Sequence, residues 1–473
     1  MHFNRRIYGI ENEFGIASQH ADGSYSQPTV DSLEHTVYLQ QIENSILISH
    51  SSDYQFLWHS NGSVTYIDIG YHPEHASPEC LSVRDAVRYN KASELLASRV
   101  FDYSPTRLLL FKNNLGYDQD SPGLDGASGY YGCHENYLLE NCPANNVAAI
   151  EELKPLLGML ATRQIFDGAG WWRKNGDFCI SQRAGGIYSE IGFSATSDRS
   201  FFQLKKGDTG SEMRLHVVCG DANICEFAGY LKIGTMSLIL SLFESGCFPE
   251  IICMNPLDAL KSISQSADPH ARLVQINDGS YINALDMQII FFESVHRQLS
   301  GASYADDELE AEIREIMAKW EQSLNAVSSR DYEWMRGRFD YATKQYLAQQ
   351  EITRKAASSP HNIQDIRKTV DIMYHGISNP ALHQRMKSKW HDRRIFTDAD
   401  IEDAAISAPQ NTRARIRGLF VNILKNRRVV YPVINWTQFG FTKGTRFLKA
   451  DIPSARTTSS PEFDLLLQEL ESI

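Results

Sequence analysis

The 473-residue sequence predicts an α+β protein in which a strand-rich part precedes a mainly helical part. Residues 1–220 alternate short strand-like segments with turns and helices, whereas residues 228–375 follow a helical period. A break around residues 408–412 then precedes an Arg-rich helix, several strand-like segments and a short final helix. We therefore expect a large domain over residues 1–408 and a small C-terminal domain over residues 409–473.

Four strand-like segments in the first part each pair an apolar face with a face of polar or ionisable groups. They are Ile7–Ile16, Val64–Gly70, Leu108–Asn114 and Met213–Val218. Any one of them is explained as an amphipathic strand with a solvated face. Four together, carrying short acids such as Glu11 and Glu13 between glycines, favour a face that binds a hard cation such as Mg²⁺. The polar faces also carry Tyr66, Asp68, Arg214 and His216.

Three further segments are predicted to be loops or are ambiguous. His72–His75 directly follows the second strand as a loop that contains Glu74. A Gly-rich loop at 123–132 leads into Cys133–Tyr137, and on its own it is equally explained as a surface loop. The alternating arginines at 413–417 indicate either a solvated basic face or a phosphate clamp. No Walker A motif and no strand-linked GxGxxG motif is present, so nothing supports a P-loop or Rossmann site.

The helical part predicts a buried core. The apolar stretch 222–247 contains Glu226, Lys232 and Glu244, so we expect a core helix rather than a membrane span. Asp306 marks the start of a predicted helix over residues 307–324. This helix has one apolar stripe, which is typical of a helix packed on a core. The stripe consists of Leu309, Ile313, Ile316, Met317, Trp320 and Leu324.

Composition limits the class of protein. With 42% hydrophobic and 22% charged residues the chain is globular, and its length allows two or three structural units. The net charge of −12 disfavours a general nucleic-acid binder but permits nucleotide binding through a metal ion. The eight cysteines form no CxxC pair, and the N-terminal segment lacks the apolar region of a signal peptide. We therefore expect reduced thiols in a cytoplasmic protein with no membrane partner.

Ten short motifs, spread in order through nearly the whole chain, resemble those of the Pup ligase and Pup deamidase/depupylase family. No single motif is decisive, but the ordered set is highly specific. The motifs lie at residues 5–15 (RRIYGIENEFG), 61–62, 66–74 (YIDIGYHPE), 77–80, 111–114, 131–137 (YGCHENY), 181–184, 214–217, 220–223 and 412–418 (TRARIRG).

The resemblance implies a large glutamine synthetase-like domain, in which a curved antiparallel sheet covered by helices carries the active site. A small C-terminal α/β domain would close the nucleotide site. It also implies that ATP phosphorylates the side-chain carboxylate of the C-terminal glutamate of a small disordered Pup-like modifier. The amine of a lysine on an acceptor protein then attacks, giving an isopeptide bond in a pathway that feeds proteasomal degradation. Mg²⁺ would offset the charge repulsion in the first step, and a base would accept the amine proton in the second.

The family's functional residues carry over to individual positions of this sequence. Asp68 falls on the position of the proposed base, and Glu11, Tyr66 and Glu74 fall on metal-binding positions. His216 lies in a motif expected to reach a second metal ion. The resemblance places ATP contacts at Ser77, at Trp436 on the adenine side, and further at Glu13, Asn114, Glu135, Arg183 and Arg415.

The chain departs from the family pattern at two places. Val64 stands where the family has an arginine near ATP, and residues 200–212 lack the family's Asn-Thr-Arg-Asp-Glu-Pro stretch. These differences bear on the nucleotide geometry and on the identity of the modifier.

Three features favour the ligase over the depupylase or deamidase branch. Glu11 and Tyr66 are only 55 positions apart, which leaves no room for the long insertion of the depupylase. Cys133 stands where the depupylase has serine, and Arg413-Ala-Arg415 stands where it has Arg-Ala-Tyr. The reverse enzyme, another ATP-dependent carboxylate–amine ligase and a non-catalytic binding protein remain alternatives; the last is disfavoured because a scaffold would not need the retained acids.

Overall fold

The protein is described by a computed structural model that divides into two compact units. Unit 1 comprises residues 1–6, 111–205 and 213–395, and unit 2 comprises residues 7–110, 206–212 and 396–473. Each unit is considered by itself. The structure describes residues 1–21, 25–26, 45–49, 55–68, 72–101, 107–116, 130–140, 151–173, 175–192, 198–210, 212–266, 268, 270, 273–356, 362–377, 386–427 and 429–472.

An antiparallel run of five strands organises unit 2. Its order is β2 (Tyr8–Glu13), β8 (Pro73–Ala76), β7 (Val64–Ile67), β6 (Gln55–His59) and β5 (Ser45–Ser49). The single strand predicted over Ile7–Ile16 is divided, because β2 ends at Glu13 and a strand of another sheet begins at Gly15. Within β2 the predicted alternation is confirmed, since Tyr8 and Ile10 are buried and Glu11 and Glu13 are half-buried. Helix α2 (Val83–Phe101) packs on β2 and β8, and α14 (Asp398–Ile406) packs on α2. A second sheet has the order β4 (Tyr25–Ser26), β3 (Gly15–Gln19) and β9 (Arg107–Phe111).

The prediction of a loop at His72–His75 was wrong, because most of this segment forms strand β8. It pairs with β2 on one side and with β7 on the other. Pro73 is tolerated since it opens the strand, where a missing backbone N–H costs least. The local sequence shows no strand pattern. The segment forms a strand because it pairs with β2 on one side and β7 on the other in the folded protein.

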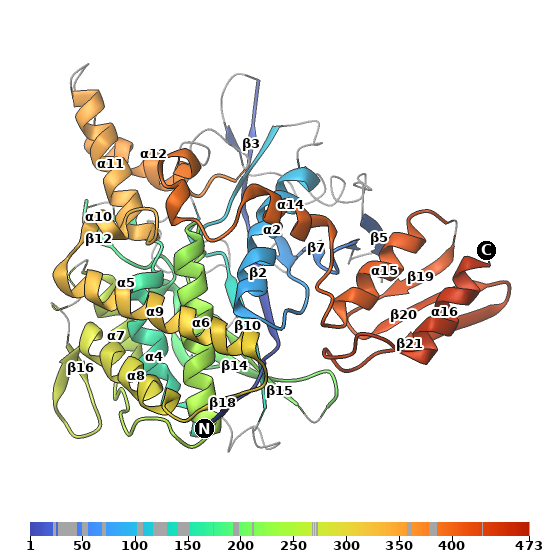
Figure 1. The fold of residues 1–473 in the computed structure, drawn as a ribbon. Coiled ribbons are helices and arrows are strands. Elements are labelled where there is room, and N and C mark those ends of the chain that lie inside the picture. The colour runs from blue at the N-terminus through green and yellow to red at the C-terminus, as the bar shows by residue number, and fades with distance from the viewer. Residues whose placement is uncertain are drawn as a thin grey trace. The chain divides into compact units, whose positions relative to one another are not determined.

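The C-terminal segment of unit 2 follows the predicted order of helix, strands and helix. It contains α15 (Ala414–Leu424), the sheet β19 (Val430–Ile434), β20 (Gln438–Lys443) and β21 (Arg446–Asp451), and α16 (Pro461–Glu471). Figure 1 shows the three strands side by side with α16 next to β21. Aromatic rings of this segment share one apolar cluster with Trp58, Val64 and Ala76 from the five-stranded run. The expected boundary at 408/409 therefore does not coincide with the limits of the compact units.

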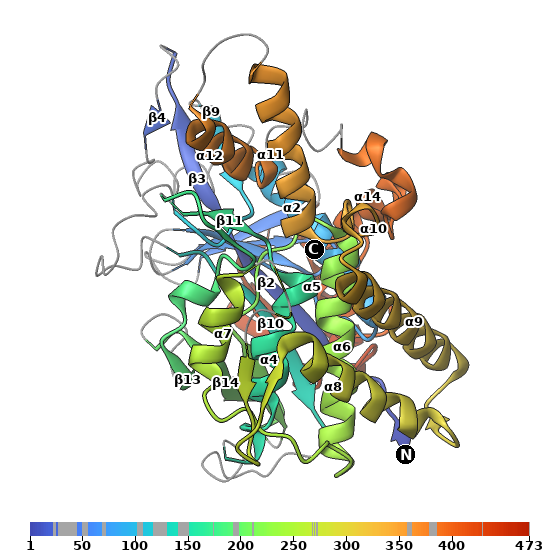
Figure 2. The same ribbon diagram turned by 90° about the vertical axis from the view of Figure 1, so that its left-hand side faces the viewer.

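Helices dominate unit 1, as predicted for residues 228–375. Among the described residues its helices include α4 (Leu156–Thr162), α5 (Gln164–Asp167), α6 (Glu226–Glu244), α7 (Pro256–Ser264), α8 (Ala284–Leu299), α9 (Asp307–Ser329), α10 (Tyr332–Met335), α11 (Asp340–Ala356) and α12 (Ile363–Tyr374), with short 3-10 turns at Ala184–Gly186 and His391–Arg393. Helices α6, α8 and α9 pack together (Figure 2). Asp306 caps α9 by accepting a hydrogen bond from the Leu309 amide, and the predicted apolar stripe is buried.

Helix α6 is long and apolar enough to cross a membrane by length and composition, but 89% of its most apolar window is buried within the protein. Such burial is typical of a core helix, which agrees with the prediction for residues 222–247.

The strands of unit 1 are mostly short. Four of them form a run in the order β13 (Ser189–Ile191), β14 (Ser200–Lys206), β15 (Met213–Val217) and β10 (Cys133–Leu139). Three two-stranded sheets pair β11 (Trp171–Trp172) with β12 (Phe178–Cys179), β16 (Leu273–Gln275) with β17 (Tyr281–Asn283), and β1 (His2–Phe3) with β18 (Ser303–Tyr304).

Candidate active site

Three adjacent strands of unit 2 bring Glu13, Glu74 and Tyr66 into one row. Glu13 on β2 lies opposite Glu74 on β8, and Glu74 lies opposite Tyr66 on β7. Directly opposed residues project from the same face of a sheet with their Cβ atoms about 4.5–5.5 Å apart. The strand pairing therefore brings Glu13 together with two strands that lie more than fifty positions later in the sequence.

Two further acids, Asp68 and Glu11, extend the row. Glu11, Glu13, Tyr66, Asp68 and Glu74 together are called the acidic row below. One carboxylate oxygen from each of Glu13, Asp68 and Glu74 lies within 4.8 Å of the others. Asp68 is held at the end of β7, where its backbone amide donates to the His72 carbonyl at 2.9 Å. The Nδ1 atom of His72 lies 3.4 Å from the Glu13 carboxylate. Glu11 precedes Glu13 by two positions on β2, so it projects from the same face.

The acids perturb one another because the row is largely withdrawn from water. Burial raises the pKa of Glu74 well above its ordinary value, and the charges of Glu11, Glu13 and Asp68 raise it further. Burial, followed by the charges of Glu74 and Glu11, likewise raises the pKa of Tyr66, which hydrogen-bonds to Glu74. Carboxylates held this close favour the uptake of a proton or a cation. A set of hard oxygen donors fits Mg²⁺ or a similar divalent ion, and the chain would hold it with these side chains.

Trp436 and Ser77 also belong to unit 2. The ring of Trp436 packs edge-on to Trp58 with centroids 5.4 Å apart, and both Trp436 and Tyr66 border the same apolar cluster. Trp436 thus lies on the face that carries the acidic row. The Ser77 hydroxyl accepts from the Ile10 amide at 2.9 Å, so it ties β2 to the segment after β8. Their roles in ATP binding remain predictions.

The three alternating arginines separate once the helix forms. Arg413 and Arg417 are buried and both bind the carboxylate of Glu79. Arg415 is exposed and donates to the Thr458 carbonyl at 2.7 Å. Because Glu79 engages two of the three guanidinium groups, neither a solvated basic face nor a three-arginine phosphate clamp describes this segment. A contact between Arg415 and ATP stays a prediction.

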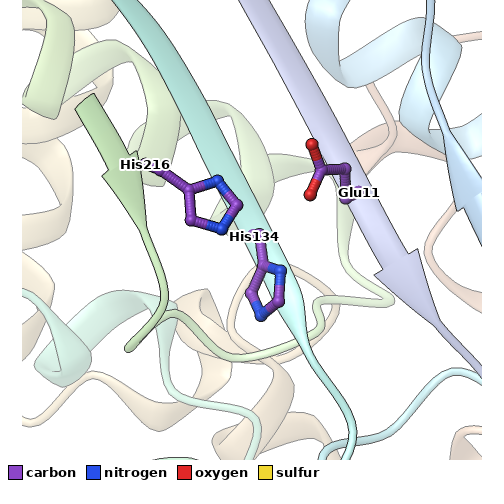
Figure 3. A group of neighbouring side chains, drawn as sticks. All are labelled: Glu11, His134 and His216. Atoms are coloured by element: carbon purple, nitrogen blue, oxygen red, sulfur yellow. The ribbon is translucent and has the colours of Figure 1, made fainter. Parts of the chain in front are cut away.

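His216 lies in unit 1, on β15. Its Nδ1 lies 2.8 Å from Asn136 Oδ1, which also accepts from Arg214 at 2.5 Å. Since that oxygen only accepts, the nitrogen that faces it, Nδ1, carries a proton, which leaves Nε2 as the ring nitrogen that could bind a metal. The ring of His134, from β10, lies beside it with centroids 4.9 Å apart (Figure 3). Glu11, also labelled in Figure 3, belongs to unit 2 and was described with that unit.

Asn114 and Arg183 are buried in unit 1 and hold its backbone. Asn114 donates to the Tyr131 carbonyl and accepts from the Ala222 amide, at 2.8 and 2.7 Å. Arg183 donates from Nε to the Val218 carbonyl at 3.2 Å. Both side chains are engaged within the unit, and their contacts with ATP remain predictions.

Glu135 is fully buried against Arg163, with Nη2 and Oε1 2.5 Å apart. Burial alone would raise the pKa of Glu135, but the charges of Arg163 and Lys232 outweigh it, so the pKa is lowered. Alternation along β10 places Glu135 on the opposite strand face from His134. The structure therefore gives Glu135 a structural partner, and its predicted place at ATP is untested.

Several residues with clear roles were missed by sequence reasoning. His134 and His72 stand inside quoted motifs, and strand alternation in Cys133–Leu139 was the signal that could have singled out His134. Asp221 was also missed: its carboxylate accepts from the amides of Ala169, Gln182 and Arg183 and from the Ser181 hydroxyl. This carboxylate explains why two separate motifs, at 181–184 and 220–223, occur together.

The structure shows what this chain has at the two places where its sequence departs from the family pattern. Val64 is 1% exposed and packs in the apolar cluster of unit 2, so no cationic side chain occupies that position. Residues 200–206 form β14, and Asp208 pairs with Arg413 at 2.7 Å. Most of the Gly-rich loop at 123–132 lies outside the described residues.

Comparison with known proteins agrees with these features. The family model described as Pup-ligase protein matches residues 6–439. A Pup–protein ligase of Paenarthrobacter aurescens is 31% identical over 439 residues, covering 88% of this chain and 89% of the relative. One from Acidimicrobium ferrooxidans is 30% identical over 447 residues, covering 91% of each.

Two solved structures share the fold over nearly the whole chain. The complex between the prokaryotic ubiquitin-like protein Pup and its ligase PafA matches with a TM-score of 0.81 and 26% identity, covering 99% of this chain and 93% of the other. The Pup ligase PafA in complex with ADP matches with a TM-score of 0.74 and 25% identity, covering 95% of each. The α+β fold expected from the sequence is confirmed, and the chain belongs to the Pup-ligase family.

Proposed function

We propose that this chain is an ATP-dependent ligase that joins the side-chain carboxylate of the C-terminal glutamate of a Pup-like modifier to lysine side chains of acceptor proteins. The observation that carries the proposal is the acidic row in a member of the Pup-ligase family. One carboxylate oxygen from each of Glu13, Asp68 and Glu74 lies within 4.8 Å of the others. Relatives named Pup–protein ligases, and family structures that contain Pup or ADP, support both the modifier and the nucleotide.

The chemistry has two steps. ATP first transfers its γ-phosphoryl group to the modifier carboxylate and leaves as ADP; the lysine amine then displaces phosphate to form the amide. Bound Mg²⁺ would offset the negative charge that ATP and the carboxylate bring together. The acidic row holds that charge-neutralising site through Glu11, Tyr66 and Glu74, and His216 with His134 beside it would serve a second cation.

Asp68 is proposed as the base of the second step. The lysine ammonium group must lose a proton before its nitrogen can attack, and a positioned carboxylate typically accelerates such a proton transfer by about 10²–10⁴-fold. Asp68 stands at the end of β7 rather than inside it, where it is half-buried and accessible to an amine. Trp436 would contact the adenine from the same face of the unit, because it packs against Trp58 beside the cluster that Tyr66 borders.

We further propose a cytoplasmic location. All seven cysteines within the described residues are free thiols, and six of them are buried. Thiols in this state are typical of a reducing compartment. Modified acceptors would then be available for proteasomal degradation in the same compartment.

The test compares Asp68→Asn with the wild type and with Asp451→Asn, a control at an exposed aspartate on β21. Calorimetry measures Mg·ATP binding, and a ligation assay uses a Pup polypeptide that ends in glutamate together with a lysine-rich acceptor. We expect Asp68→Asn to bind Mg·ATP nearly normally while ligation falls at least about 10²-fold. The control should ligate normally, and EDTA should abolish ligation by the wild type.

Two outcomes contradict the proposal. Loss of Mg·ATP affinity together with ligation would make Asp68 a metal ligand rather than the base. Near-normal ligation by Asp68→Asn would exclude both roles.

A further inference from the structure

A second row of polar side chains lies directly behind the acidic row. Asn12 on β2 is opposite His75 on β8, and His75 is opposite Thr65 on β7. Each of these residues is next in sequence to a member of the acidic row, so it projects from the opposite face of the sheet. All three are 1% exposed. The same strand register therefore determines both rows.

Hydrogen bonds link the rear row to His59 at the end of β6. The Thr65 hydroxyl lies 2.9 Å from His75 Nδ1 and 2.8 Å from His59 Nε2. Asn12 Nδ2 donates to Asn90 Oδ1 on α2 at 2.5 Å. Polar groups buried this deeply are stabilising only when their hydrogen bonds form. The rear row is therefore stable only when its side chains are placed so that these bonds can be made.

The hydroxyl joins two imidazoles with a single proton. It donates to one ring nitrogen and accepts from the other, so both imidazoles carry their proton on Nε2 or both carry it on Nδ1. Burial lowers the pKa of His59 to about 3, and burial together with the charge of His59 lowers that of His75 well below its ordinary value. A single hydroxyl proton shared in this way requires that each ring carries only one proton.

The rear row matters because repulsion between the acids of the acidic row disfavours the strand pairing that brings them together. Glu13, Glu74 and Asp68 repel one another, and nothing in their mutual charges holds β7 and β8 in register. A slip of one residue would exchange the two faces and put His75 and Thr65 where the acids stand. An apolar rear face would tolerate small shifts, whereas directional hydrogen bonds from strand to strand do not.

We propose that Thr65, His75 and His59 form a positioning network that holds β6, β7 and β8 in register and thereby sets the spacing of Glu74, Tyr66 and Asp68 for cation binding. The network touches neither ATP nor the reacting atoms and acts only through the acidic row. The inference rests on the proposed function, in which that row binds the divalent cation.

The experiment compares Thr65→Val, which keeps the shape and removes the hydroxyl, with Thr65→Ser, which keeps the hydroxyl. Mn²⁺ alone serves as the probe, and its binding to the full-length protein is followed by electron paramagnetic resonance. Loss of a hydrogen-bonding partner behind a metal ligand typically costs about 10–100-fold in metal affinity. We expect such a loss in Thr65→Val and recovery to within about threefold of the wild type in Thr65→Ser.

Thr235→Val is the matched control. Thr235 is equally buried, in α6 of the other unit, and its hydroxyl donates to the Leu231 carbonyl at 2.7 Å. This variant measures the general effect of removing a buried hydroxyl and should leave Mn²⁺ affinity unchanged. The nitrogen NMR signals of ¹⁵N-histidine-labelled wild type at pH 7 supply a readout independent of metal: His59 and His75 should each show one fixed tautomer, on the same-named nitrogen.

Each result bears on the inference. Equal Mn²⁺ affinity in Thr65→Val and wild type, or an equal loss in the Thr235→Val control, overturns it. If Thr65→Val does not fold, the wild-type NMR signals decide, and exchanging or opposite tautomers overturn it. Normal Mn²⁺ binding without ligation by the wild type would instead contradict the proposed function and leave the positioning role standing.

Discussion

Replacing Glu79 by glutamine tests whether one half-buried carboxylate ties the C-terminal segment to the strands of unit 2. Glu79 Oε1 accepts from Arg413 Nε and Nη2 at 3.1 and 2.6 Å and from Arg417 Nη1 at 3.3 Å. Arg417 also lies over the ring of Trp436, with its guanidinium carbon 4.6 Å from the centroid. Glutamine keeps the shape of the side chain but leaves two buried cations without their central anion.

The magnitude follows from the pKa of Glu79. Burial alone would raise this pKa, but Arg417 and Arg413 outweigh it and lower it from 4.5 to about 2. Each pKa unit corresponds to roughly 1.4 kcal/mol, so the ionised carboxylate contributes about 3 kcal/mol to stability. This agrees with the roughly 3–5 kcal/mol usually lost when one partner of a buried pair is removed.

The sign of the pH dependence follows from the lowered pKa. The contribution is fully present above the unfolded pKa of 4.5 and is lost as the pH falls through the folded value of about 2. At pH 3 only about 1 kcal/mol should remain. The cost of Glu79→Gln should therefore shrink from about 3 kcal/mol at pH 7 to less than half of that at pH 3.

Urea unfolding followed by tryptophan fluorescence measures this cost, because Trp58 and Trp436 flank the Arg417 guanidinium. Glu462→Gln, at an exposed position in α16, is the control and should change stability by less than about 0.5 kcal/mol. A cost of Glu79→Gln below about 1 kcal/mol at pH 7, or a cost that grows towards pH 3, would refute the reasoning.

Two further substitutions test the proposed adenine contact of Trp436 and the hydrogen bonds that Asp221 accepts within unit 1. Trp436→Ala should weaken Mg·ATP binding about tenfold in calorimetry, since stacking of a base on an aromatic ring is worth about 1–3 kcal/mol; unchanged affinity would count against an adenine contact. Asp221→Asn should destabilise unit 1 by about 3 kcal/mol in thermal denaturation, because a carboxamide cannot accept from four donors and one of its own groups donates. A neutral effect would show that the turn at 181–184 does not depend on this carboxylate.

Features that depend on near neighbours in the chain could be predicted from the amino-acid sequence. Alternation in Tyr8–Glu13 and Met213–Val217 placed their apolar and polar faces, and the stripe and cap of α9 gave a helix that the structure confirms. The order of helix, strands and helix after residue 412 was also predictable. The ordered motifs indicate the family and point to Glu11, Tyr66, Asp68 and Glu74.

Which of these groups become neighbours depends on how the strands pair in the folded protein. Glu13 and Glu74 become neighbours because β8 pairs between β2 and β7, and no pattern within His72–Ala76 specifies those partners. The same pairing decides that Thr65 and His75 form a row behind the acids. Local patterns reflect a residue's neighbours within a few positions, whereas strand register and buried ion pairs depend on contacts between segments far apart in the chain, which periodicity does not encode.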